Sequence, residues 1–191
     1  MKISYCTACK GRLWQLKQTI EHNLSFMKRG EFELCVLAYN DDLVEPYLNE
    51  HFAEHIADGR LKVKTHHDDY KPLDGSDFAC GYVKNLSHAM GTGKILFNLD
   101  ADNFIDNAHE LLLQLKAGQI IKNTAIPLDG RSGRIGVYRT LFKKVGGYRD
   151  TGRTDDGDFV LRCLRAGAKL LHMDCEIAPI PNQQKDINHD L

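Results

Sequence analysis

Short apolar stretches alternate with helical apolar periodicities along the first hundred residues. Apolar side chains that recur every three to four positions predict helices, and the short apolar or alternating stretches between them predict strands. The predicted strands cover 2–8, 32–40, 60–66 and 94–100, and the predicted helices cover 13–27, 44–56 and 78–90. This alternation is typical of an α/β protein with a mainly parallel sheet flanked by helices.

The pattern changes after residue 103. We expect a helix over about 107–116, strands in "TAIPL" and "RIGVYR", a short helix around "TLFKKV", a helix over about 156–166 and a strand in "KLLHMDCEIA". These elements no longer alternate strictly, so they predict a mixed sheet in the second half. The polar ending, 181–191, reads as a loose tail or as the point where a longer protein was cut.

Composition favours one folded domain over residues 1–191 and excludes several kinds of partner. Hydrophobic residues make up 42% of the chain, which argues against disorder. The 25 basic and 26 acidic residues give a net charge of −1, and helix-turn-helix, zinc-finger, RNA-recognition and P-loop patterns are absent from the sequence. We therefore expect no nucleic-acid partner.

The sequence also carries no apolar run of about 18 residues, so no transmembrane segment is expected. Its first residues lack the apolar core of a signal peptide, and its six cysteines stand mostly in apolar runs. These features predict a cytoplasmic protein with reduced thiols. The spacing of Cys6 and Cys9 matches a CxxC pair, but no second pair accompanies it, which favours ordinary buried cysteines.

Asp100 and Asp102 follow the predicted strand at 94–100. Ligands of open α/β sheets bind outside the carboxyl ends of the strands, where this pair is expected. In an extended segment, side chains two residues apart point to the same side, so both carboxylates could hold one Mg²⁺ or Mn²⁺, with Asn103 and water as further ligands. The alternative is that Asp102 or Asp106 only caps the next helix.

Two motifs surround these acids and resemble those of GT-A fold glycosyltransferases of the family-2 type. "KNLSHAMGTGKILFNLDADNFI" matches the stretch R-N-x-G-x-x-x-A-x-G, a strand and D-x-D. "GVYRTLFKKVGGYRDTGRTDDGDFVLRCLRAGAKL" resembles the acceptor-side segment with G-G-aromatic, an acid cluster and R-x-x-x-x-G. The matching positions are Asn85, Ala89, Gly93, Asp100, Asp102, Gly146, Gly147, Tyr148, Asp155, Asp156, Asp158, Arg162 and Gly167.

The resemblance covers about 2–171 and implies a Rossmann-like GT-A fold, with a nucleotide-binding half at about 1–103 and an acceptor-binding half at about 104–180. It implies an inverting transfer of a sugar from a nucleotide-sugar donor, most commonly a UDP-sugar, to a carbohydrate or other hydroxyl acceptor. The cofactor would be Mn²⁺ or Mg²⁺ on Asp102 and Asp100. The family's third ligand, often a His, has no clean match, and His172 and His189 are the candidates.

Each implied role has a competing structural explanation. Asp156 would be the general base, with Gly147, Tyr148, Asp155 and Asp158 on the acceptor; acids at a helix N-terminus also cap it, and paired glycines also end helices. The donor would contact Thr7, Ala8, Arg12, Asn40, Asp41, Lys84 and Asp100. Asn40 and Asp41 fit a turn and helix cap equally well, and Lys84 fits a solvated helix face.

The sequence departs from the family pattern at three places. Asp155 stands where glutamate is usual, Asp150 stands where the double-glycine motif carries glutamate, and Lys84 stands where arginine often precedes the asparagine. The charge signs are kept, but the side chains differ in reach.

Two other functions stay open. The chain could be a non-catalytic nucleotide- or carbohydrate-binding module of a larger glycan-building protein. Under either function it could have a partner domain or form a homo-oligomer. A sugar-phosphate nucleotidyltransferase is less favoured, because "TACKGR" lacks the G-x-G-T-R type of signature.

Overall fold

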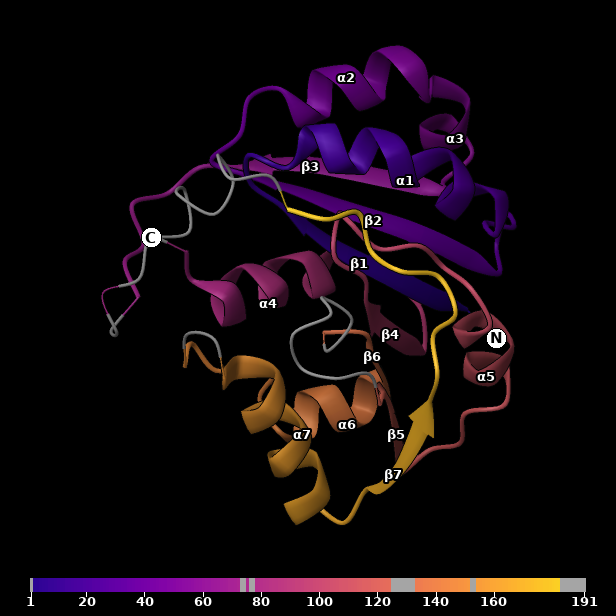
Figure 1. Cartoon of the computed structure of the whole chain (residues 1–191), viewed down its shortest axis with the longest axis vertical. Helices are drawn as coiled ribbons and strands as arrows, with labels where there is room; N and C mark the ends of the chain where they lie inside the picture. Colours follow the sequence, from indigo (N-terminus) through magenta and orange to yellow (C-terminus); the bar gives the residue numbers. More distant parts are fainter. Residues whose placement is uncertain (1, 73–74, 76–77, 125–132, 152–153, 183–191) are drawn as a thin grey trace.

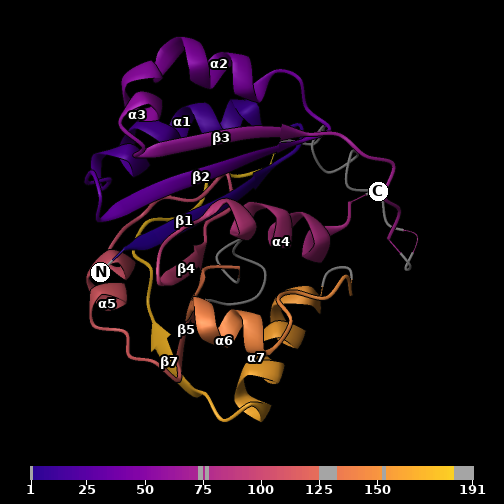
Figure 2. The ribbon, with the colours of Figure 1, turned by 180° about the vertical axis from the view of Figure 1, so that it is seen from behind.

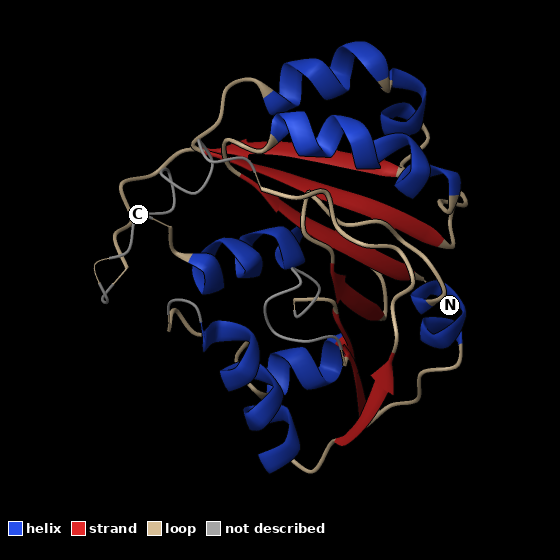
Figure 3. Cartoon of the chain, in the orientation of Figure 1, coloured by secondary structure: helices blue, strands red, loops and turns tan. Residues whose placement is uncertain are grey.

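The computed structural model describes residues 2–72, 75, 78–124, 133–151 and 154–182. Strands and helices alternate up to β4 and become mixed after it, as the sequence predicts (Figures 1 and 3). The elements are β1 (Ile3–Cys9), α1 (Leu13–Ser25), β2 (Phe32–Tyr39), α2 (Val44–His51), α3 (Ala53–Ala57), β3 (Leu61–His66), α4 (Cys80–Met90), β4 (Ile95–Asn98), α5 (Ala108–Leu113), β5 (Gln119–Asn123), β6 (Ile135–Tyr138), α6 (Arg139–Lys144), α7 (Asp155–Arg165) and β7 (Lys169–Met173).

The strands form one seven-stranded sheet in the order β3-β2-β1-β4-β6-β5-β7. Strands β3, β2, β1 and β4 run parallel, and β7 is parallel to β5. Strand β6 is antiparallel to both of its neighbours, β4 and β5. Because of this reversal, the first residues of β6 lie at the same edge of the sheet as the last residues of β4.

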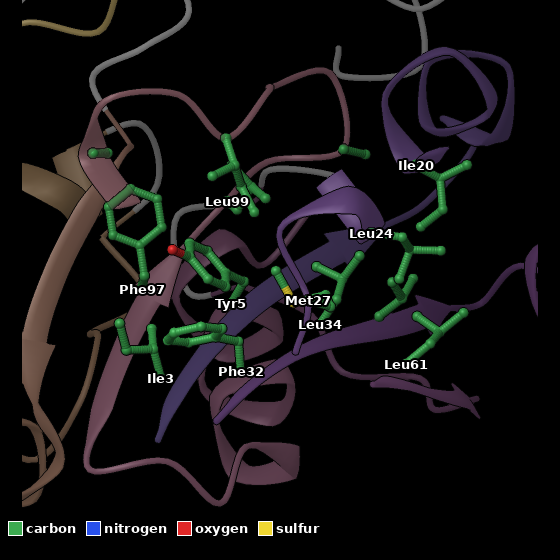
Figure 4. Packing of buried hydrophobic residues seen from close by; sticks show 14 of the residues in the cluster. Ile3, Tyr5, Ile20, Leu24, Met27, Phe32, Leu34, Leu61, Phe97 and Leu99 are labelled. Atoms are coloured by element: carbon green, nitrogen blue, oxygen red, sulfur yellow. The ribbon is translucent and has the colours of Figure 1, made fainter. Parts of the chain in front are cut away.

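Helices cover both faces of the sheet. Helices α1, α2, α3 and α5 lie on one side, and α4, α6 and α7 lie on the other (Figures 1 and 2). All eight residues of β2 are buried, as expected for a strand with helices over both faces. The apolar stripe of α1 packs on alternate residues of β1 and β2, where Ile20 and Leu24 approach Leu34 (Figure 4). This packing anchors the strands whose carboxyl ends carry the candidate site.

A buried carboxylate ties the opposite edge of the sheet together. Glu33, near the start of β2, accepts hydrogen bonds from Ser4 Oγ at 2.6 Å and from the backbone and side chain of Thr92. Its side chain is fully buried and pairs with Lys2 at 2.6 Å and Lys62 at 2.9 Å. Burial alone would raise its pKa, but these donors outweigh burial and lower the pKa to about 2.

The α/β class, the mainly parallel first half and the mixed second half are confirmed. The predicted helix over 44–56 is divided at Phe52 into α2 and α3. Strand β5 was not predicted, because its apolar core is only Ile120 and Ile121. The strand expected in "TAIPL" falls mostly on 125–128, and most of the polar tail falls on 183–191, both outside the described residues.

Candidate active site

The Asp100–Asp102 pair lies directly beyond β4 at the carboxyl edge of the parallel strands. The backbone N–H of Asn103 donates to the carbonyl of Asp100 at 2.9 Å, so the pair belongs to a turn. The expectation that Asp100 and Asp102 lie in an extended segment is therefore wrong, and the turn determines the direction of both carboxylates. Asp106 stands one residue before the N-cap of α5, and its Oδ1 accepts the N–H of Ala108, the first residue of that helix, at 3.2 Å.

The second acid pair begins α7. Asp155 and Asp156 both accept hydrogen bonds from Lys84 Nζ, at 2.7 Å each. Lys84 comes from α4 and its side chain is 10% exposed, so the alternative of a solvated Lys84 on a helix face is wrong. Its ammonium pairs with the acceptor-side acids rather than with solvent, and it links α4 to α7.

One carboxylate of each acid pair lies beside Gly133, two residues before β6. A Cβ placed on this glycine would lie 2.7 Å from Asp100 Oδ2 and 3.3 Å from Asp156 Oδ2. The Gly133 carbonyl accepts a hydrogen bond from Asn98 Nδ2 at 2.9 Å, and the same amide donates to Asp100 Oδ1 at 3.0 Å. The backbone of Gly133 thus fits between the two carboxylates, in a space that leaves no room for a side chain.

Burial and mutual repulsion dominate the electrostatics of this cluster. Burial raises the pKa of Asp100, and Asp156 raises it further, against the opposing effect of Lys84. Burial and the charge of Asp100 raise the pKa of Asp102 to about 6. Burial likewise raises the pKa of Asp155 to about 6, although Lys84 opposes the shift. Burial alone would lower the pKa of Lys84, but the surrounding carboxylates raise it well above its usual value.

The two sequence motifs meet through Asn85. Its Nδ2 donates to the Tyr148 carbonyl and its Oδ1 accepts the Tyr148 N–H, both at 2.8 Å. Gly147 has a φ of +67°, and a Cβ there would overlap Asn85 Oδ1. A Cβ on Gly81 would overlap the backbone carbonyl of Arg149. Helix α4 therefore holds the double-glycine segment by its backbone.

The other residues expected on the acceptor side have structural partners. The Tyr148 ring is buried, stacks on Phe159 at 4.3 Å between ring centroids and lies under Lys84 Nζ. Asp158 pairs with Arg162 at 2.7 Å, and Arg162 donates to the Val145 carbonyl at the end of α6.

On the donor side, the hydrogen bonds favour structural roles for the loops after β1 and β2. Thr7 Oγ1 donates to the Leu99 carbonyl at 2.7 Å, which ties β1 to the residue just before the Asp100–Asp102 turn. Asp41 accepts the N–H groups of Gly11 and Leu43, as a turn and cap residue does. Arg12 donates to Gln15 Oε1 at 3.1 Å and to the side chain of Asn182. Ala8 lies on the half-buried part of β1.

Asn40 and Asp68 hold the loop after β3 next to these donor-side residues. Asn40 exchanges hydrogen bonds with the backbone of Asp68, and Asp68 accepts from Tyr39 at 2.6 Å and from Tyr82 and His66 at 2.7 Å. The sequence did not show that Asp68 organises this loop. The spacing of aromatic residues around Asp68 was the available signal.

His172 lies on the exposed edge strand β7, opposite Lys122 of β5. Among the described residues, no hydrogen bond or ion pair joins His172 to Asp100 or Asp102, and His189 lies outside the described residues. Within the described part of the chain, no three His, Cys, Asp or Glu side chains group in a way that could hold a metal ion. The Asn103 amide oxygen, a further ligand expected from the sequence, accepts a hydrogen bond from Arg134. Among the described residues, Asp100 and Asp102 stay the candidate cation ligands.

Comparison with known proteins places this site in a recognised fold. No protein-family model matches the sequence, and no curated protein matches it by sequence. The mannosyltransferase PcManGT from Pyrobaculum calidifontis, solved with GDP-Man and Mn²⁺, superposes with a TM-score of 0.73 at 13% identity, over 96% of this chain and 58% of that one. The chain has the GT-A fold.

Two further glycosyltransferase structures match this GT-A fold. S. aureus TarS 1–349 gives a TM-score of 0.68 at 12% identity, over 94% of this chain and 59% of that one. GalNAc-T7 with UDP, GalNAc and Mn²⁺ gives 0.68 at 11% identity, over 91% of this chain and 42% of that one. The chain therefore spans less than two thirds of each of these proteins. Among the described residues, no helix of the GT-A fold is long and apolar enough to cross a membrane.

Proposed function

We propose that this GT-A domain is a metal-dependent glycosyltransferase that moves a sugar from a nucleotide-sugar donor to a hydroxyl acceptor. The proposed donor is a UDP-sugar, and the proposed transfer inverts the configuration of the anomeric carbon. The observation that carries the proposal is the convergence on Gly133, where a carboxylate of the strand-end pair and a carboxylate of the α7 pair flank one backbone position. Transfer needs such a juxtaposition, because the leaving group and the attacking hydroxyl meet at a single anomeric carbon.

Asp100 and Asp102 are the residues that would hold the cation. Their oxygen donors suit Mg²⁺ or Mn²⁺, and the raised pKa of Asp102, caused by burial and by Asp100, marks a site where positive charge would relieve repulsion. A divalent cation would supply Lewis-acid stabilisation of the departing diphosphate. The mannosyltransferase and GalNAc-T7 structures, both solved with Mn²⁺ and a nucleotide, support this assignment.

Asp156 would act as the general base. Its Oδ1 accepts from Lys84, and its Oδ2 faces Gly133 and Asp100, toward the expected position of the donor. The acceptor hydroxyl would give its proton to this carboxylate while its oxygen bonds the anomeric carbon and the bond to the diphosphate oxygen breaks. Attack from the face opposite the leaving group inverts the configuration. Lys84 would keep Asp156 in place and stay on the acceptor side.

Calorimetric titration with UDP, with and without Mn²⁺, tests the donor role. We expect binding that requires the metal and is lost in Asp102→Ala. Asp58→Asn removes an acid paired with Arg60 in the turn before β3 and serves as the control for loss of a carboxylate. Binding of neither UDP nor GDP under any metal condition would refute the donor site.

Substitution of the base separates the enzyme from a non-catalytic binding module. In Asp156→Asn we expect Mn²⁺-dependent UDP binding to persist while sugar transfer falls by at least about 100-fold. Product anomeric configuration, read by NMR, tests inversion directly. If wild-type protein binds UDP but neither transfers nor hydrolyses any UDP- or GDP-sugar, the binding-module function replaces the enzyme.

A further inference from the structure

Arg134 has the largest fully buried side chain in the described part of the chain. It stands next to Gly133, at the entrance to β6, and is 1% exposed. Its guanidinium reaches three residues on two segments: Nε donates to Asn103 Oδ1 at 2.5 Å, one terminal nitrogen lies 3.3 Å from Asp106 Oδ2, and the other donates to the Ile177 carbonyl at 3.1 Å. The roles assigned above to the two acid pairs make no use of this residue.

The guanidinium determines which way the Asn103 amide points. Arginine has five N–H donors and no acceptor, so the group facing Arg134 Nε must be the amide oxygen. The amide nitrogen then faces the other way, where it donates to Asp102 Oδ1 at 2.5 Å. The hydrogen bonds therefore run in one direction, from Arg134 through Asn103 to Asp102.

Asn103 is well placed to transmit this orientation because its backbone is fixed. It is fully buried, its N–H donates to Asp100, and its carbonyl accepts from Asn23 Nδ2 at 2.9 Å. With the backbone held on both sides, the amide can respond to Arg134 only by rotating about its own side-chain bonds. A 180° turn of the amide would set its oxygen against the Asp102 carboxylate.

The other two acceptors of Arg134, Asp106 and Ile177, belong to a set of hydrogen bonds that joins the loop after β4 to the C-terminal segment. Asp106 Oδ2 also accepts the N–H of Ile177, at 3.2 Å, and the Ile180 N–H donates to the Asp102 carbonyl at 2.8 Å. The charge of Asp106 compensates that of Arg134 in the interior, so the arginine acts on Asp102 through geometry more than through net charge.

We propose that Arg134 is a positioning residue for the cation site: through Asn103 it fixes one oxygen of Asp102 and so sets how this carboxylate meets a divalent cation. The inference rests on the proposed function, because it assumes that Asp100 and Asp102 bind a metal. Partners that orient metal ligands in this way typically change metal affinity by about 10- to 100-fold when they are removed.

Mn²⁺ affinity measured by electron paramagnetic resonance, in the presence of saturating UDP, tests the proposal without relying on turnover. We expect Arg134→Met and Asn103→Ala each to weaken Mn²⁺ binding by about 10- to 100-fold. Because both act through one chain of hydrogen bonds, the double variant should lose little more than either single variant. Arg134→Lys, which also presents only donors, should recover part of the affinity.

Arg139→Met is the matched control. Arg139 follows β6 at the other end and donates to the carbonyls of Gly91 and Gly93, far along the strand from the acids. This variant should lose stability, measured by urea unfolding, and keep wild-type Mn²⁺ affinity. If Arg134→Met does not fold, the Mn²⁺ affinity of Asn103→Ala tests the inference in its place.

Three results would overturn the inference. Wild-type Mn²⁺ affinity in Asn103→Ala would show that the amide does not position Asp102. Additive losses in the double variant would show that the two residues act separately. A failure of the wild-type protein to bind Mn²⁺ would remove the inference and the proposed metal dependence together, which distinguishes it from the first two results.

Discussion

The double glycine of the acceptor-side motif offers a paired test of how this site is held together. Gly146 and Gly147 both have positive φ, +78° and +67°. An alanine at either position is strained by about 1–2 kcal/mol, because Cβ approaches the following carbonyl in the left-handed region. Their surroundings differ: nothing lies within 4 Å of a Cβ on Gly146, whereas a Cβ on Gly147 would overlap Asn85 Oδ1.

That overlap adds a definite cost. Asn85 is held by two hydrogen bonds of 2.8 Å to the backbone of Tyr148, so it cannot move aside without losing them. Each bond contributes about 1 kcal/mol net. We therefore expect Gly147→Ala to lower the free energy of unfolding by about 3–4 kcal/mol and Gly146→Ala by about 1–2 kcal/mol.

Urea unfolding followed by circular dichroism measures both variants under the same conditions. The difference of about 2 kcal/mol corresponds to a melting temperature about 4–8 °C lower for Gly147→Ala than for Gly146→Ala, given a chain of this size. Introducing Asn85→Ala into the Gly147→Ala background should then cost little, since its bonds are already broken. Equal destabilisation by the two alanines would refute the Asn85 clamp.

Three further expectations test other parts of the structure. Gly133→Ala should abolish Mn²⁺-dependent UDP binding, because its methyl group enters the space beside Asp100; unchanged binding would contradict this arrangement. Lys84→Met should lower the free energy of unfolding by about 3–5 kcal/mol, because it leaves the buried carboxylate of Asp155 and the partly buried carboxylate of Asp156 without their cation, and Lys84→Arg should restore most of it. Glu33, whose pKa is lowered from 4.5 to about 2, stabilises the fold above pH 4.5. Its contribution, about 1–3 kcal/mol, should disappear as the pH falls from 4.5 to 2, and Glu33→Gln should flatten this acid limb of the unfolding curve.

Hydrophobic periodicity predicted the order of the strands and helices, because that order depends on which side chains are buried. The stripe of Leu16, Ile20 and Leu24 faces the sheet in α1, and the strand-end position of Asp100 and Asp102 follows from the apolar run before them. Boundaries were harder to predict where local geometry departs from the pattern. Phe52 keeps the helical spacing but adopts φ −130° and ψ 30°, which ends α2. Residues 119–123 carry too few apolar positions to stand out as a strand.

The partners within the site could not be predicted, because they join segments that are distant in sequence. Lys84 and Asp155 are separated by 71 residues and meet only because α4 and α7 lie on the same face of the sheet. Arg134 flanks an apolar strand, where a charged residue is ordinarily exposed. Its acceptors lie on the loop after β4, at Asn103 and Asp106, and at Ile177 nearer the C-terminus, and a one-dimensional pattern does not bring these segments together.

Because β6 is the reversed strand among the described strands of the sheet, its pairing with β4 sets the position of the residues that precede it relative to the acids that follow β4. Asn98, the last residue of β4, pairs with Ile135, the first residue of β6, and this register fixes how far Gly133 and Arg134 extend past the acids. The register is itself held by packing deeper in the sheet, where a Cβ on Gly136 would crowd Leu112 and Ile121. A substitution at Gly136 would therefore displace Gly133 and Arg134 relative to the proposed cation site without changing any residue of that site. Screens for altered activity in this chain should include the middle of β6 as well as the loops at its edge.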